Sequence, residues 1–124
     1  MAKIKEDYVS YETAKLLKRS GFDCDEISCI NVFKGHTYKV QDTVVDADED
    51  VTIPTIQMAK KWLRETHNKS IEIRSQGLKV TSVGWIVEIY NLVTQDEEFH
   101  HPYTFTTYEE ACEAAIKYCL ENLI

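Results

Sequence analysis

Residues 85–93 read WIVEIYNLV, and the rest of the fold is expected to be built around this run, the longest β-like stretch of the chain. Its β-branched and aromatic residues are typical of a strand. Shorter alternating runs at Ile71–Arg74 and Leu78–Val80 precede it, and we expect all three to be strands. After a polar turn at Asp96–Glu98, Tyr103–Phe105 is expected to pair briefly as an edge strand.

Two helices on either side of these strands carry clear start signals. Thr107 and Glu110 form a capping box, in which each side chain accepts a hydrogen bond from an otherwise unpaired backbone N–H. The other helix is expected over Tyr11–Ser20, with Ser10 as its N-cap and Gly21 in the left-handed position that ends it. The apolar face of the last helix consists of Ala111, Ala115, Ile116, Cys119, Leu120 and Leu123. This wide face predicts a helix packed on a sheet.

A third helix is expected in the middle of the chain and ends near His67. Pro54 fits its first turn, and Asn68 is a suitable residue to end it. Its apolar side consists of Ile56, Ala59, Trp62 and Leu63. In the segment between the Tyr11–Ser20 helix and this third helix, two β-rich runs at Cys29–Phe33 and Thr37–Val40 predict a hairpin. The segment 41–53 that follows carries five acids and no base, so we expect an acidic, solvated loop there.

Together these elements predict an α+β fold in a single globular domain over residues 1–124. The expected order is α-β-β-α-β-β-(β)-α, with an antiparallel sheet of about four to five strands and three helices packed mainly on one face. The sequence shows neither the alternation of strands and helices nor the glycine-rich turn of a parallel nucleotide-binding sheet.

The charge balance argues against nucleic acid or a membrane as the partner. The chain carries 14 Lys and Arg against 21 Asp and Glu, a net charge of −7, and this excess of acid disfavours contact with phosphates. Lys60, Lys61 and Arg64 flank Trp62, the minimum needed for stacking on bases, but Trp62 has core spacing and is expected to be buried. The five basic and ten acidic residues of 63–124 leave open an acidic inhibitor of a nucleic-acid-processing enzyme.

The N-terminus and the cysteines indicate the compartment. Two lysines near Met1 are followed by no apolar segment of the kind found in signal peptides, so we expect a cytoplasmic protein without a membrane anchor. In that compartment we expect the four cysteines to be free structural thiols. They are Cys24, Cys29, Cys112 and Cys119.

Metal and catalytic patterns are incomplete. Asp46, Asp48 and Asp50 have the spacing that begins an EF-hand loop, but its sixth position is Val51 instead of Gly and its twelfth is Gln57 instead of Glu. The cysteine spacings do not match zinc knuckles, and no His lies beside a Cys in a recognisable catalytic pattern. We therefore predict no metal site and no cofactor, and we favour a non-enzymatic protein.

The first functional hypothesis is an interaction or accessory protein that binds an unknown protein partner or forms a homodimer. Its acidic contact residues would be Asp46, Asp48, Glu49 and Asp50. The alternative is a protein that binds a small ligand or nucleotide, for example to sequester a signal in counter-defence. Its lining residues would be Trp85, Tyr90, His100 and Tyr103.

The chain contains several short motifs: VSYETAKLL at 9–17, GF at 21–22, PT at 54–55, WLRE at 62–65, HN at 67–68 and YEEA at 108–111. These motifs resemble those of a group of short uncharacterised proteins of Bacteroides-type gut bacteria and their phages or mobile elements. The chain departs from the group in its acidic stretch and its four cysteines. The resemblance implies a phage or prophage origin and brings no known activity with it.

Overall fold

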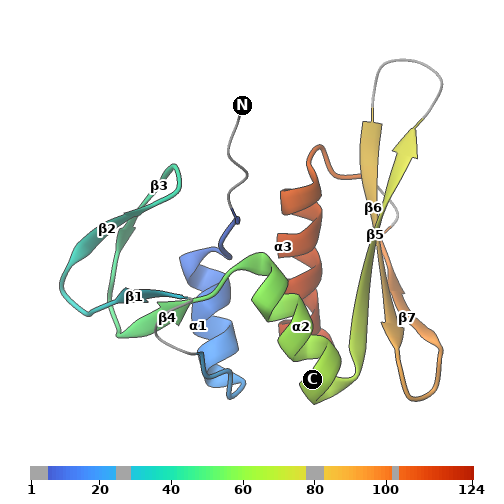
Figure 1. The fold of residues 1–124 in the computed structure, drawn as a ribbon, viewed down its shortest axis with the longest axis horizontal. Helices are drawn as coiled ribbons and strands as arrows, with labels where there is room; N and C mark the ends of the chain where they lie inside the picture. Colours follow the sequence, from blue (N-terminus) through green and yellow to red (C-terminus); the bar gives the residue numbers. More distant parts are fainter. Residues whose placement is uncertain (1–5, 25–28, 78–82, 102–103) are drawn as a thin grey trace. The chain divides into compact units, whose positions relative to one another are not determined.

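The computed structural model describes residues 6–24, 29–77, 83–101 and 104–124. The chain divides into two compact units, residues 1–59 and residues 60–124 (Figure 1). The fold is α+β, with three helices and antiparallel strand pairs, as the sequence predicts. Within the described ranges, seven strands form three separate sheets, so the prediction of one sheet with four to five strands is corrected in strand number and order.

Helix α1 (Tyr11–Arg19) forms for the local reasons that the sequence gives. The Ser10 side chain accepts a hydrogen bond from the backbone of the first turn. At the other end Gly21 has a φ of 95°, and the Phe22 N–H donates to the Leu17 carbonyl at 2.9 Å. This hydrogen bond satisfies a backbone carbonyl at the end of the helix, where no further turn supplies a donor. Only glycine adopts such a φ at little cost.

The strands of the first unit pair differently from the prediction. Strand β1 (Ile30–Val32) pairs with β4 (Val51–Ile53), and β2 (Thr37–Val40) pairs with β3 (Thr43–Asp46). The predicted hairpin between the first two runs is therefore wrong. A two-residue turn at 41–42 joins β2 to β3, and so short a connection makes these two strands the natural partners.

The predicted acidic loop at 41–53 is also wrong, because β3 and β4 lie within it. Successive side chains of an extended chain point to opposite sides. The odd-numbered apolar residues of this segment are buried: Val45, Ala47, Val51 and Ile53. The even-numbered acids between them are exposed: Asp46, Asp48 and Asp50. The acids thus mark the solvent side of a segment that contains two short strands and also contributes to the core.

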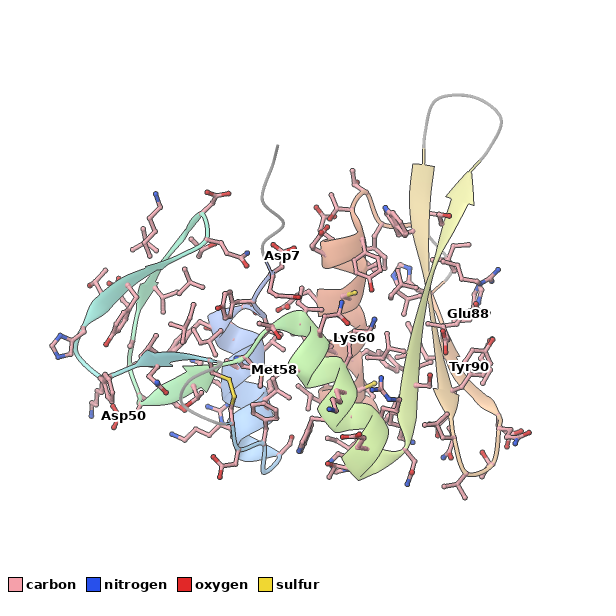
Figure 2. The ribbon with its side chains drawn as sticks, viewed as in Figure 1. Asp7, Asp50, Met58, Lys60, Glu88 and Tyr90 are labelled. Carbon is pink, nitrogen blue, oxygen red and sulfur yellow. A yellow bond between two sulfur atoms is a disulfide. The ribbon has the colours of Figure 1, made fainter. Side chains whose placement is uncertain are left out.

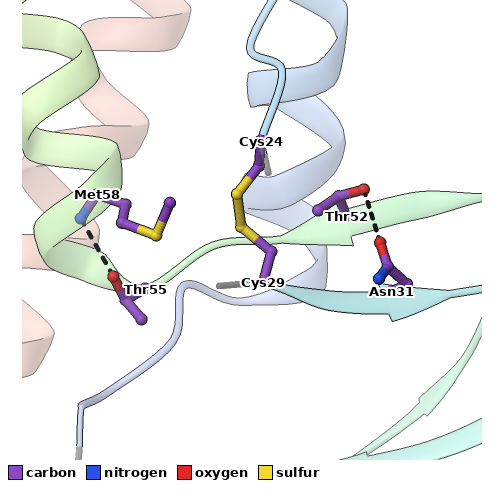
Figure 3. The surroundings of a disulfide bond; sticks show 6 residues. All are labelled: Cys24, Cys29, Asn31, Thr52, Thr55 and Met58. Carbon is purple, nitrogen blue, oxygen red and sulfur yellow. Dashed lines mark hydrogen bonds between the residues drawn. A yellow bond between two sulfur atoms is a disulfide. The ribbon is translucent and has the colours of Figure 1, made fainter. Parts of the chain in front are cut away.

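Two cysteines of the first unit form a disulfide, Cys24–Cys29 (Figure 3). Their Cα atoms lie 6.7 Å apart, one after the end of α1 and the other immediately before β1. The prediction of free thiols is therefore wrong for this pair. It is confirmed for Cys112 and Cys119, which are free and buried.

Helix α2 (Ile56–His67) begins one residue after Thr55, the residue that caps it. The Thr55 hydroxyl accepts a hydrogen bond from the Met58 N–H at 3.2 Å (Figure 3). Pro54 therefore precedes the helix, whereas the sequence placed it in the first turn. Asn68 follows the last helical residue with a φ of 57°, which confirms the predicted end.

The second unit is built on one antiparallel sheet in the order β5-β6-β7 (Figure 1). Its strands are β5 (Lys69–Gly77), β6 (Val83–Asn91) and β7 (Glu97–His100). The prediction of a polar turn at Asp96–Glu98 is wrong, because β7 begins at Glu97. The predicted strand at Leu78–Val80 lies outside the described residues.

The predicted edge strand at Tyr103–Phe105 is reduced to a single bridge between Phe105 and Trp85, and Tyr103 lies outside the described residues. Thr104 lies against Gly84 of β6. A Cβ added at Gly84 would lie 2.4 Å from the Thr104 Cβ, so this close approach requires glycine.

Helix α3 (Tyr108–Tyr118) packs on β5 and β6 and continues into a π-helical turn, η1 (Cys119–Leu123). The Thr107 hydroxyl accepts from the Glu110 N–H at 3.1 Å, as the capping box predicts. The buried residues on the helix side of this unit include Val87, Ile89, Ala111, Cys112, Ala115, Ile116 and Cys119. Among the described residues, no helix combines the length and apolar character needed to cross a membrane.

Candidate functional site

The face of the β5–β6–β7 sheet that points away from α3 carries a polar cluster centred on Glu88. Alternate residues of β6 point to opposite sides, so Val87 and Ile89 are buried towards α3 while Glu88 and Tyr90 lie on the other face. Figure 2 shows Glu88 and Tyr90 on that side of the sheet. In the strand register, Glu88 lies opposite both Glu72 of β5 and His100 of β7.

Glu88 is 8% exposed, and two donors fix its carboxylate. The Arg74 Nε donates to Oε1 at 2.6 Å, and the Tyr90 hydroxyl donates to Oε2 at 3.1 Å. An acid with so little access to water needs such partners, because an unpaired charge there is costly. Charge-assisted hydrogen bonds of this kind fix the position of the Glu88 carboxylate and stabilise its ionised form.

These bonds shift the ionisation of both partners. Hydrogen bonding from Arg74 holds the pKa of Glu88 below its ordinary value, against the opposing effect of burial. The bond to Glu88 raises the pKa of Tyr90 to about 12. At neutral pH the cluster therefore contains a carboxylate anion and a phenol that keeps its proton.

His100 and Glu97 of β7 complete the cluster. The His100 Nδ1 lies 3.6 Å from the Glu88 Oε2 and 4.0 Å from the Glu97 Oε1. An irregularity in the pairing between Ile89 and Tyr90 shifts the register, so that Tyr90 pairs with Glu97. One nitrogen and two carboxylate oxygens converge as a result, all within 4.8 Å of one another.

The cluster is anionic and lies beside a hollow. Glu72, Glu88 and Glu97 contribute three carboxylates, against the one guanidinium of Arg74. Along the same strands, an open hollow of about 460 Å³ extends from Tyr90 towards the turn after β6. It is lined by Ser70, Glu72, Tyr90, Asn91, Leu92 and Gln95. The face thus offers negative charge together with a concave surface that is partly apolar.

The structure brings together two of the four residues predicted to line a ligand site. Tyr90 and His100 both reach Glu88. Trp85 lies on the other side of the sheet, where its ring makes an edge contact with Tyr108 at a centroid distance of 5.3 Å. Tyr103 lies outside the described residues. The predicted set is therefore divided between two faces.

The acids of the predicted interaction loop make contacts within the first unit. Asp46 accepts from the Thr37 hydroxyl at 2.8 Å, and Asp48 accepts a hydrogen bond from the Tyr11 hydroxyl. Glu49 forms ion pairs with two basic residues at the end of α1, Lys18 and Arg19. The Asp50 carboxylate accepts from the Lys34 N–H at 2.8 Å. Asp46 thus connects β3 to β2, whereas the other three acids connect the segment before β4 to α1 and to the turn after β1.

A second, smaller hollow of about 220 Å³ lies in the first unit beside the disulfide. Lys18, Phe22, Cys24, Phe33 and Asp50 are among its lining residues. The Lys18 Nζ donates to the Asp50 carbonyl at 2.6 Å, so its charge is engaged in a contact between α1 and the residue before β4.

Sequence reasoning missed Glu88, Arg74 and Glu97. The signal for Glu88 was a single acid inside an otherwise apolar strand, which in a half-buried sheet marks the face opposite the core. Its partners lie on two other strands, and the sequence gives no local signal for that register. Comparison of the chain with protein-family models, curated proteins and solved structures found no match.

Proposed function

We propose that this chain is a non-enzymatic, cytoplasmic interaction protein of phage or prophage origin, and that it binds a protein partner through the Glu88 face and the outer edge of β5. The origin rests on the motif resemblance alone. The contact surface rests on the geometry of the second unit, and the observation that carries it is the set of mutual bonds that order the charged side chains of an exposed sheet face. Side chains ordered before binding lose less conformational entropy when a partner arrives.

The edge of β5 adds a second means of attachment. This strand is nine residues long, and in the described part of the chain its strand partner is β6. An outer strand presents backbone N–H and C=O groups along its edge, where an extended segment of another chain can pair. Either a different polypeptide or a second copy of this chain can use such an edge.

The free cysteines favour a binding role over nucleophilic catalysis. Burial raises the pKa of Cys112, and it raises the pKa of Cys119 to about 12. The reactive form of cysteine is the thiolate, so these thiols are poor nucleophiles at neutral pH.

Quantitative capture from a lysate of the source organism tests the proposal. The unaltered chain is compared with Glu72→Lys on the face and with Glu121→Lys in η1, an exposed position with the same change of charge. We expect a polypeptide captured by the unaltered chain and by Glu121→Lys to fall about tenfold or more with Glu72→Lys. Light scattering after size exclusion detects self-association in the same three proteins. Equal capture and equal mass for all three would contradict the proposed surface.

The hollow beside Tyr90 favours a second candidate function, the binding of a small ligand. Its volume of about 460 Å³ is within the range of small-molecule sites, and its lining combines a phenol and a carboxylate with the apolar Leu92. Native mass spectrometry of the protein purified from its source, without added ligand, tests this candidate. A retained small mass that Tyr90→Ala abolishes would support it, and the bare chain mass would exclude a tightly held ligand.

A further inference from the structure

We propose that Glu88, Glu97 and His100 bind a divalent transition-metal ion, of which Zn²⁺ is the representative, on the exposed face of the β5–β6–β7 sheet. The inference goes beyond the proposed interaction function and stands or falls separately from it. It rests on the convergence of the three ligand atoms, the charge around them and the hollow beside them.

The distances between the ligand atoms fit a site that closes with small side-chain movements. Around a tetrahedral zinc ion with bonds of about 2.0–2.2 Å, neighbouring ligand atoms lie about 3.4 Å apart. The His100 Nδ1 lies 3.6 Å from Glu88 and 4.0 Å from Glu97, and all three ligand atoms lie within 4.8 Å of one another. The His100 and Glu97 side chains are 47% and 40% exposed, so they have room to turn towards an ion.

The ligand types select the class of metal. An imidazole nitrogen with two carboxylate oxygens suits zinc and its neighbours better than Ca²⁺ or Mg²⁺, which take mainly oxygen ligands. Three protein ligands leave a fourth position for water or for a group of a bound molecule. The hollow at Tyr90 lies on the same face and gives such a molecule a place beside the ion.

The groups around Glu88 are arranged to orient a ligand. Arg74 occupies the Oε1 atom, which leaves Oε2 as the atom directed towards His100. Tyr90 donates to that same Oε2 and restricts its rotation. Hydrogen bonds of this kind to metal-binding carboxylates orient the ligand and raise metal affinity.

The local charge favours a cation. Glu72 and Glu88 lie directly opposite each other across two strands, an arrangement of like charges that destabilises a sheet. Arg74 compensates one of the three nearby carboxylates, and two negative charges remain. A bound divalent cation would balance them.

Isothermal titration with Zn²⁺ alone, on the full untagged chain after treatment with a chelator, tests the proposal. We expect one saturable site that is weakened about tenfold or more in His100→Ala and in Glu97→Gln. His36→Ala is the matched control, because His36 is exposed and lies in the first unit, and its affinity should equal that of the unaltered chain. Absence of saturable binding, or an equal loss in His36→Ala, would overturn the proposal.

A measurement on the unaltered chain keeps the test independent of variant folding. Zn²⁺ added to the protein should shift the imidazole NMR resonances of His100 at stoichiometric metal and leave those of His36 in place. Equal shifts at both residues, or shifts at neither, would refute the site. Capture of a protein partner does not enter these readouts, so failure of the metal site and failure of the interaction function are distinguishable.

Discussion

Opening the Cys24–Cys29 disulfide should destabilise the first unit by about 2 kcal/mol. The bond closes a loop with a sequence separation of 5. The chain-entropy relation for so short a loop gives a stabilisation of about 2 kcal/mol, because the bond restricts the unfolded chain. That difference corresponds to a factor of about 30 in the folding equilibrium.

Hydrogen exchange measured on the oxidised and the reduced protein gives the assay. In the reduced protein, the amides of α1 and β4 that exchange through unfolding of the first unit should exchange about 30-fold faster. Both tryptophans, Trp62 and Trp85, belong to the second unit, so their fluorescence reports on the stability of the other part of the chain.

Thiol counting supplies the control. Alkylation of the unfolded but unreduced protein should label two cysteines, Cys112 and Cys119, and reduction should raise the number to four. Four labelled thiols before reduction would show that the bond is absent. Equal exchange rates in the two forms, with the bond present, would refute the entropic argument.

Gly21→Ala should cost roughly 1–2 kcal/mol in the denaturant-induced unfolding of the first unit, because its φ of 95° disfavours any side chain while the space around it is open. Gly84→Ala should cost roughly 1–3 kcal/mol through its contact with Thr104, and Thr104→Gly in the same chain should restore most of that loss in thermal unfolding. The hydrogen bond from Tyr11 holds the pKa of Asp48 below its ordinary value. The stability that this bond provides is therefore complete at a pH above the ordinary carboxyl range. It is lost below about pH 4, as the pH falls through the lowered pKa. Acid unfolding followed by circular dichroism should show this loss in the unaltered chain and a weaker pH dependence in Asp48→Asn.

The helices were predictable because their signals are local. The cap residues Ser10 and Thr107 each lie within three residues of the N–H that they accept from. Gly21 and Asn68 end their helices through their own backbone conformations. Such contacts depend on residues a few positions apart, which a sequence pattern contains directly.

Strand pairing was not predictable in the same way. The partner of β1 is β4, and the β-rich runs next to each other in the sequence were paired instead. In the segment 41–53 the number of acids concealed an alternation of Val45, Ala47, Val51 and Ile53, which is the pattern of an extended chain with one buried side. Charge composition alone did not distinguish a solvated loop from a segment with a charged outer side.

The Glu88 cluster could not be predicted from the sequence for the same reason, because it depends on strand pairing. Tyr90 and His100 were chosen for their chemistry, and they meet because β6 and β7 pair in one particular register with an irregularity between Ile89 and Tyr90. A shift of that register by one residue would move one strand's contribution to the opposite face. The chemistry of the site therefore depends on a non-local property, and Trp85, chosen by the same reasoning, falls on the opposite face.

Of the two cysteine pairs, the Cys24–Cys29 pair bears on the compartment and the buried pair does not. Cys112 and Cys119 are buried, and burial raises the pKa of each, so they resist oxidation in any compartment. The Cys24–Cys29 bond is typical of an oxidising environment, whereas the proposed function places the protein in the cytoplasm. A cytoplasmic location therefore predicts that alkylation in intact cells labels Cys24 and Cys29, and that the first unit operates there without the stabilisation of the bond. Protection of both residues in cells would place the protein in an oxidising compartment, and would require a partner for the Glu88 face to be present there as well.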